Sequence, residues 1–285
     1  MKCALKSAMA VFALLFLFAT FLYPQSTAGI ELNLGTEAYR NAKFEEAAHH
    51  FEKAVALAPD NVVAHLYLAT TYAQQFIPGI DKPGNLHMAE LAIRHYQSVL
   101  DSDSATALGS KIPSAKGIAS LYFNMKQFDD ARKYNHVVSD LDPKDPDPYY
   151  SLGVIDWTMC YQPRMEARTK LGLQPDEALN PKNKDQKKVC DELKAKNAPM
   201  IEDGIDSLNR AIELRPDYDD AMAYLNLMYR ERADVECDDL AARDADFKNA
   251  DEWVDKTIAV KKAKAKKADQ HSPQQKSGPT VPNPQ

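Results

Sequence analysis

Apolar and small residues recur along this chain in a repeated order. Three segments show the order most clearly: Leu34–Pro59, Ile118–Pro143 and Leu152–Pro216. Each starts with an apolar residue, a small residue and an aromatic residue at helical spacing. Each then continues into a second run with a small residue, an apolar or aromatic residue and a final proline. Because these spacings fit the 3.6-residue period of a helix, the pattern predicts repeated helical hairpins.

The first copy is the cleanest. Its helices are expected over residues 31–42 and 44–57, and Pro59 stops the second helix. The residues expected to meet across this hairpin are Leu34, Gly35, Ala47 and Phe51. Small residues are needed at such points because the two backbones approach each other closely. A hairpin of this kind cannot bury its apolar face alone, so the fold is expected to be a stack of hairpins.

These residues resemble the tetratricopeptide repeat (TPR), a helix–turn–helix unit of about 34 residues. The resemblance covers about Glu31 to Ala268, with further copies starting at Val62 and Asp219, and the solenoid domain is expected over residues 29–268. It implies an all-α fold, a right-handed α-solenoid of about five TPR repeats. The first and second helices of a repeat are called helix A and helix B below.

Three of the turns between helix A and helix B are longer than the repeat requires. The insertions lie at about residues 77–87, 162–197 and 236–247. Within the second insertion, two short helices are expected, Arg164–Leu171 and Lys187–Lys196. Asn197 is then a candidate N-cap of the helix that follows, with Pro199 in its first turn. Since these turns share one edge of a solenoid, the insertions are expected to form an extra layer there, either as a binding surface or as loops without a partner.

The N-terminal residues follow a different pattern. Lys2 and Lys6 precede about 15 apolar residues, from Ala8 to Leu22, and a polar stretch with small residues follows. This order is typical of a secretory signal peptide, and the run is short for a membrane span. We expect residues 1–28 to be a signal peptide cleaved after Ala28, and the protein to be exported to the periplasm or cell envelope. The alternative is an uncleaved segment that anchors the chain in the membrane.

Composition and charge narrow the choice of partners. Among 285 residues only 10 are glycine, and β-branched runs are sparse, which favours helices over sheet. The formal net charge is −6, and the basic residues are not gathered on one repeated face, so nucleic acid is not an expected partner. Residues 269–285 are rich in Pro, Gln, Ser and Asn and are predicted to be a disordered tail.

Motifs for catalysis are missing from the sequence. It contains no G-x-S-x-G, no H-E-x-x-H, no C-x-x-C-H and no glycine-rich phosphate loop. His49 and His50 are adjacent and therefore point to different faces of a helix, which makes them a poor metal pair. We accordingly expect no enzyme activity, no cofactor and no metal. An enzyme built from the insertion layer would have little room for a preorganised site.

Removal of the signal peptide leaves three cysteines. Cys160 is expected to end helix A of the fourth repeat, Cys190 lies in the insertion of that repeat, and Cys237 lies in the neighbouring turn. An odd number in an exported chain indicates one disulfide and one further thiol. Our hypothesis is a Cys190–Cys237 bridge that joins the two insertions. A bridge from Cys160 to either of the others is the alternative.

The resemblance also implies where a partner would bind. In TPR proteins the A helices line the concave face, which typically holds an extended peptide or a helix. The side chains expected on that face are Tyr39, Arg40, Thr70, Gln74, Phe123, Asn124, Tyr150, Val154, Trp157, Leu227 and Arg230. Aromatic residues supply large contact area there, although Trp157 and Phe123 could instead pack against neighbouring repeats.

The function we predict is therefore that of a non-catalytic TPR scaffold or adaptor. It would bind a protein or peptide partner in the concave groove, in the periplasm or cell envelope. The alternative from another class is a carrier for an envelope glycan or lipid, because grooves rich in Tyr and Trp also suit sugars.

Overall fold

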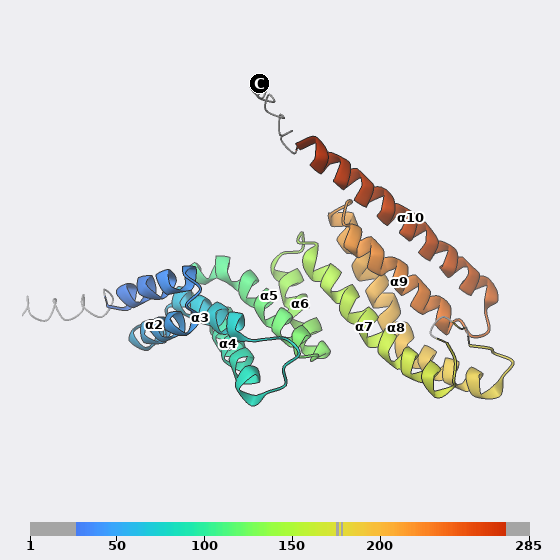
Figure 1. Ribbon diagram of the computed structural model, residues 1–285, viewed down its shortest axis with the longest axis horizontal. Helices are drawn as coiled ribbons and strands as arrows, with labels where there is room; N and C mark the ends of the chain where they lie inside the picture. Colours follow the sequence, from blue (N-terminus) through green and yellow to red (C-terminus); the bar gives the residue numbers. More distant parts are fainter. Residues whose placement is uncertain (1–26, 175–176, 178, 272–285) are drawn as a thin grey trace, which may run out of the picture. The chain divides into compact units, whose positions relative to one another are not determined.

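The computed structural model describes residues 27–174, 177 and 179–271. Every regular element in these residues is helical, and within each of two units neighbouring helices pack against each other, as in a TPR solenoid of about five repeats (Figure 1). The predicted all-α fold class is therefore confirmed. The chain divides into two compact units, Met1–Pro148 and Tyr149–Gln285. The predicted signal peptide, apart from its last two residues, lies outside the described residues.

The first unit contains a helix over residues 27–40 followed by five α-helices and one 3-10 turn. The described part of this first helix already includes residue 27, four residues before the predicted start at Glu31. The elements that follow are α2 (Phe44–Leu57), α3 (Val62–Gln75), α4 (Pro83–Asp101), η1 (Ala105–Ala107), α5 (Leu108–Asn124) and α6 (Phe128–Leu141). α2 has the bounds that the sequence predicts.

Close approach of backbones holds the first hairpin together. A Cβ atom added to Gly35 would lie 2.6 Å from Phe51 Cε1, so only glycine fits there without a shift. Phe51 and Ala47 are fully buried, as expected from the repeat pattern. Leu34, in contrast, is 42% exposed, and the expectation that it joins this contact is wrong. It lies on the first described helix, where no earlier hairpin of the described chain covers it.

The long turn of the second repeat is shorter than predicted. Residues 76–82 form the loop, whereas the predicted insertion extends to residue 87. α4 begins at Pro83 because proline is compatible with the first turn of a helix, where its missing N–H has no partner to lose. Asn85 organises the loop: its amide donates to the carbonyls of Ile77 and Ile80, each at 2.8 Å, and its Oδ1 accepts from the Ile77 N–H at 2.8 Å.

The second unit is built from four long helices, the first of which starts two residues before the unit boundary. They are α7 (Asp147–Lys170), α8 (Lys184–Leu214), α9 (Asp219–Val235) and α10 (Leu240–His271). Their apolar faces form one core, which includes Ile201, Leu208, Leu225 and Met228. A Cβ atom added to Gly153 of α7 would lie 2.3 Å from Leu208 Cγ of α8, so the small-residue rule of the first hairpin also holds here.

The insertion of the fourth repeat lengthens this hairpin and forms no separate short helices. α7 continues through Pro163 to Lys170, and α8 runs unbroken through Pro199, so the predicted helix boundaries within residues 162–197 are wrong. Asn197 does not cap a helix. It is 1% exposed, and its Nδ2 donates to the Cys160 carbonyl oxygen at 3.2 Å. The buried amide thus links the two helices close to their prolines.

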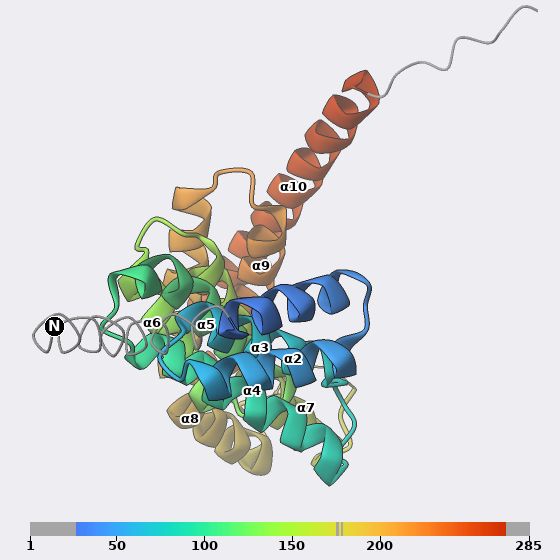
Figure 2. The ribbon, with the colours of Figure 1, turned by 90° about the vertical axis from the view of Figure 1, so that its left-hand side faces the viewer.

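The last hairpin is also extended. Residues 236–239 are the only non-helical ones between α9 and α10, so most of the predicted insertion at 236–247 belongs to α10. α10 runs antiparallel beside α9 and continues past its beginning, to His271 (Figure 2). The first three residues of the predicted tail therefore continue this helix, and the remainder lies outside the described residues. No helix in the described part of the chain is long and apolar enough to span a membrane.

Candidate functional site

Five aromatic side chains of the second unit form a continuous row, which we call the aromatic row. Its members in spatial order are Tyr218, Tyr150, Tyr224, Trp157 and Tyr161. Successive ring centroids are separated by 5.0, 5.8, 5.5 and 4.9 Å. These distances fit direct ring–ring packing. All five rings are half-buried, so each combines a packed edge with accessible surface.

Helix geometry explains why the rings meet. Tyr150, Trp157 and Tyr161 are spaced by seven and four residues and so occupy one face of α7. Tyr224 lies on α9, and Tyr218 is its N-cap residue. Both α7 and α9 are A helices of their repeats, so the row lies where two A helices run side by side.

The rings of the row are uncharged, and an arginine lies close to the ring at each end. The Arg215 guanidinium lies 4.3 Å from the Tyr218 ring centroid, and that of Arg164 lies 5.2 Å from the Tyr161 ring centroid. Burial, with smaller contributions from Tyr224 and Asp220, raises the pKa of Tyr150 to about 12. Its phenol therefore stays protonated, so the centre of the row offers flat apolar surface with hydroxyl groups.

The structure brings together only part of the predicted binding face in this unit. Tyr150 and Trp157 belong to the row, and Val154 lies half-buried on the same helix. Leu227 is half-buried on α9. Arg230 is directed toward α10, where its Nη2 lies 2.7 Å from Asp251 Oδ1.

The predicted residues of the first unit form no comparable row among the described contacts. Tyr39 packs edge-on against Phe44, and Phe123 packs edge-on against Phe128, each within its own hairpin. Thr70 is bonded internally, since its hydroxyl donates to the Leu66 carbonyl at 2.8 Å. Arg40 and Gln74 are exposed. Asn124 is half-buried at the end of α5.

Sequence reasoning missed three members of the row. Tyr218 lies in the turn between Pro216 and α9, outside the helical period, so the repeat pattern does not single it out. Tyr161 lies one helical turn after Trp157, but the predicted end of helix A at Cys160 concealed this relation. Tyr224 carries no such signal, because its place is set by how α9 packs against α7.

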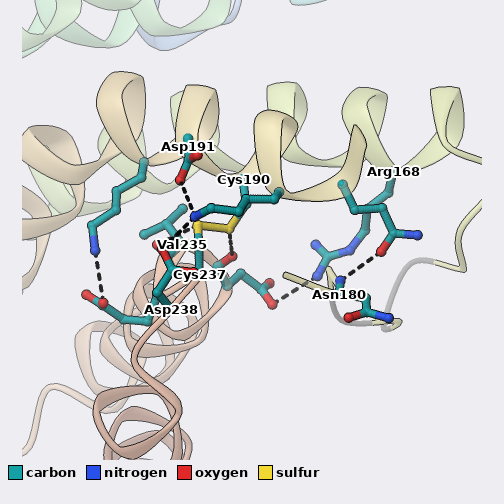
Figure 3. The surroundings of a disulfide bond; sticks show 12 residues. Arg168, Asn180, Cys190, Asp191, Val235, Cys237 and Asp238 are labelled. Atoms are coloured by element: carbon teal, nitrogen blue, oxygen red, sulfur yellow. Dashed lines mark hydrogen bonds and ion pairs between the residues drawn. A yellow bond between two sulfur atoms is a disulfide. The ribbon is translucent and has the colours of Figure 1, made fainter. Parts of the chain in front are cut away.

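The two insertions of the second unit are joined covalently. Cys190 of α8 and Cys237, in the turn after α9, form a disulfide with a Cα–Cα distance of 5.9 Å (Figure 3). This is the pair that the sequence hypothesis selected. Ion pairs surround it: Lys187 Nζ lies 2.6 Å from Asp238 Oδ2, and Lys194 Nζ lies 3.0 Å from Glu236 Oε2. Cys160, the third cysteine of the described residues, is buried outside the disulfide.

A buried charge network lies between the extended parts of α7 and α9. Arg164 binds Glu231 through two 2.8 Å contacts and Asp234 through a third at 2.8 Å. Arg168, which is 2% exposed, reaches Asp234 at 2.9 Å and donates to the Glu177 carbonyl at 2.9 Å. Burial raises the pKa of Glu231 to about 7, and the Arg164 charge opposes this effect. The network thus continues the α7–α9 contact beyond the aromatic row.

Two histidines of the first unit share one hydrogen bond. His65 of α3 and His95 of α4 face each other with their Nδ1 atoms 3.0 Å apart. His65 Nε2 lies 2.8 Å from the Pro59 carbonyl, which can only accept, so this nitrogen carries a proton. In the neutral pair His95 is therefore the donor. Burial, followed by the His65 charge, lowers the pKa of His95 to about 4.

A cavity of about 610 Å³ opens in the first unit between α4, α5 and α6. Its aromatic wall is the stacked pair Tyr122 and Tyr134, whose centroids are 5.6 Å apart. The Tyr134 hydroxyl donates to Gln97 Oε1 at 2.7 Å on the opposite wall. None of the predicted groove residues lines this opening.

Metal chemistry gains no support from the described residues, in which no group of three or more His, Cys, Asp or Glu side chains could hold a metal ion. What the aromatic row can do chemically is provide stacking surface and hydroxyl hydrogen bonds.

Comparison with known proteins identifies the fold. No family model matches the chain, and no curated protein matches its sequence. Among solved structures, the crystal structure of MamA protein matches with a TM-score of 0.53 at 17% identity, over 90% of this chain and 98% of that one. The chain has a tetratricopeptide-repeat fold.

Two further structures of this fold are similar. MamA 41-end from Desulfovibrio magneticus RS-1 has a TM-score of 0.51 at 15% identity, over 83% of this chain and 96% of that one. YrrB, described as a TPR protein with an unusual peptide-binding site, has a TM-score of 0.50 at 14% identity, over 83% of this chain and 90% of that one. At these identities the similarity shows the architecture alone.

Proposed function

We propose that this chain is a non-catalytic TPR adaptor that holds an extended segment of a partner protein on its aromatic row. The observation that carries the proposal is five half-buried rings in unbroken contact along two A helices. Rigid aromatic side chains give large contact area at low entropic cost, which is why they dominate binding hot spots. A TPR fold with a peptide-binding site exists in YrrB, which supports the same use here.

The chemistry of the row favours a neutral, extended ligand. Its rings are uncharged and spaced by 4.9–5.8 Å, and Arg215 and Arg164 lie beside its two end rings. An extended segment with apolar side chains could stack on several rings and donate backbone N–H groups to the phenol oxygens.

A matched pair of tryptophan variants tests the proposal. The chain has two tryptophans, Trp157 in the row and Trp253 on α10, and both are half-buried. Peptides selected from a random display library on the full chain should lose about 30-fold or more in affinity for Trp157→Ala, as a central hot spot implies. They should bind Trp253→Ala normally. Equal losses in both variants, or selection of no peptide while a glycan or lipid probe binds, would contradict the proposal.

We further infer that the protein acts after export, in the periplasm or cell envelope. The N-terminal order of lysines, apolar run and small residues supports this, although residues 1–26 lie outside the described part of the chain. The Cys190–Cys237 disulfide is also typical of an oxidising compartment. N-terminal sequencing of protein from a periplasmic extract should begin at Gly29. Recovery of the full chain from the cytosol alone, with both cysteines reduced, would overturn the inference.

A further inference from the structure

One segment of the chain combines a composition suited to the aromatic row with an attachment point close to it. Residues 272–285 contain four prolines and a single charged side chain, Lys276. They follow directly on α10, in the same compact unit as the row. We propose that this tail is an intramolecular ligand of the aromatic row; the inference rests on the function proposed above and names the class of segment that the row binds.

The attachment point is defined by an ion pair. Lys264 Nζ on α10 lies 2.5 Å from Asp219 Oδ1, and Lys261 Nζ lies 4.0 Å from Asp219 Oδ2. Asp219 directly follows Tyr218, the first ring of the row. Seven residues of helix separate Lys264 from His271, which is about 10 Å at 1.5 Å per residue. The tail therefore begins near the Tyr218 end of the row.

The tail is long enough to reach and cover the rings. Four steps of 4.9–5.8 Å give the row a length of at most about 21 Å. A polyproline II segment extends about 3.1 Å per residue, so the residues from 272 to 285 span about 43 Å. The tail must first cover the distance of about 10 Å from the end of α10 back to the level of Lys264, and then the row of about 21 Å. Its length of about 43 Å exceeds the sum of these two distances.

Charge and backbone preference also match. The rings of the row are uncharged, with Arg215 and Arg164 beside its end rings, and the tail has one charged side chain. Proline-rich segments dock on aromatic-lined surfaces because their polyproline II form is already ordered and loses little entropy on binding. The C-terminal part of α10 is strongly basic, since residues 256–267 carry six lysines and no acid. This segment is therefore not a suitable ligand for uncharged rings.

The consequence is competition. A ligand tethered by a short segment acts at an effective concentration in the millimolar range. The tail would therefore occupy the row in the isolated chain, and a partner segment must displace it. Weak partners are excluded, whereas a partner with more ring contacts binds.

The test uses the full chain with one reporter. Trp253→Phe leaves Trp157 as the sole tryptophan. In this background the four tail prolines, Pro273, Pro279, Pro282 and Pro284, are replaced by serine. We expect acrylamide to quench Trp157 about twofold more strongly, and a labelled peptide with the sequence of residues 272–285 to bind about 3- to 10-fold more tightly, because the internal competitor is gone. Lys266→Gln, at an exposed position on α10 outside the tail, should leave both values unchanged.

Three results would overturn the inference. The first is equal quenching and equal peptide affinity with and without the prolines. The second is a quenching difference that disappears on dilution, which would make a second copy of the chain the occupant. The third is a change of the same size in Lys266→Gln, which would show that the reporter responds to substitutions outside the tail. If library-selected peptides still require Trp157 in any of these cases, the proposed function stands and only the tail is excluded as ligand.

Discussion

The two units use the same repeat pattern but are stabilised differently beyond it. In the first unit α2 and α3 have 14 residues each, and small residues facing rings hold the hairpins, as Gly35 faces Phe51. In the second unit α8 has 31 residues and α10 has about as many. The same contact recurs there between Gly153 and Leu208, but the added helical length carries a disulfide and a buried ion-pair network.

The difference indicates how a helical repeat accepts an insertion. In the fourth repeat, the extra residues between helix A and helix B lengthen both α7 and α8. The lengthened ends extend beyond the residues whose contacts the repeat pattern provides. Arg164, Arg168, Glu231 and Asp234 provide the contact between α7 and α9 there, and Cys190–Cys237 fixes α8 to the turn after α9. The aromatic row lies on the repeat side of this region, so the extension supports the helices that carry the site.

The largest expected effect concerns the repeat contact in the first unit. Phe51→Ala removes a fully buried ring that fills the space opposite Gly35, and should lower the free energy of unfolding by about 3–5 kcal/mol. Leu34→Ala, on the helix that faces Phe51, is the control and should cost less than about 1 kcal/mol because that side chain is 42% exposed. Chemical denaturation of both variants measures the difference. Equal losses would mean that this small-residue contact is not what stabilises the hairpin.

The buried network of the second unit gives a comparable loss by another mechanism. Arg164→Met leaves Glu231, 2% exposed, without its main partner and should cost about 3–5 kcal/mol. Adding Glu231→Leu to the same chain should recover most of that loss, because no unpaired buried charge remains. Denaturation of the two single variants and the double variant forms the required cycle. Additive losses would show that the two side chains do not act as a pair.

Reduction of the disulfide should have a somewhat smaller effect, restricted to the second unit. The bridge joins residues 47 apart, and loop-closure entropy for that length corresponds to about 4 kcal/mol, with engineered and native bridges commonly giving about 2–4. Hydrogen exchange should speed up in α8 and in the turn after α9 on reduction, while α2 and α3 stay unchanged. A Cys190→Ala/Cys237→Ala variant should show no further response to the reductant.

The smallest effect is a pH dependence of the first unit. His95 has a folded-state pKa of about 4 against an ordinary value of 6.5, so the unfolded chain binds more protons between these values. Stability from this group is therefore present above pH 6.5 and is lost as the pH falls toward 4. His95→Gln should flatten that part of the stability–pH curve, whereas His136→Gln, at an exposed position, should leave it unchanged. An unchanged curve for His95→Gln would contradict the account of the histidine pair.

Local sequence patterns predict the parts of this fold that depend on neighbouring residues. Gly35 with Phe51 and the bounds of α2 follow from the repeat signature, because small and aromatic positions at fixed spacing specify one hairpin. The predicted end of helix A at Cys160 and the predicted N-cap at Asn197 are wrong, because α7 continues through Pro163 and α8 through Pro199, and the Asn197 amide links the two helices there.

The site itself could be predicted only in part. Tyr150 and Trp157 lie on one face of a helix with a clear period, and the sequence alone singles them out. Tyr224 joins them through the packing of α9 on α7, which no local pattern encodes. The Cys190–Cys237 pair could be proposed because both cysteines were assigned to turns at the same edge.

The most direct test of the claim that the aromatic row binds the partner measures the fluorescence of Trp157. In the Trp253→Phe chain, all tryptophan emission comes from Trp157. Titration with a library-selected peptide should shift that emission in a saturable way, at the same midpoint that an independent method such as calorimetry gives. Binding by calorimetry with no change in Trp157 emission would place the ligand elsewhere and contradict the claim that the aromatic row is the binding site.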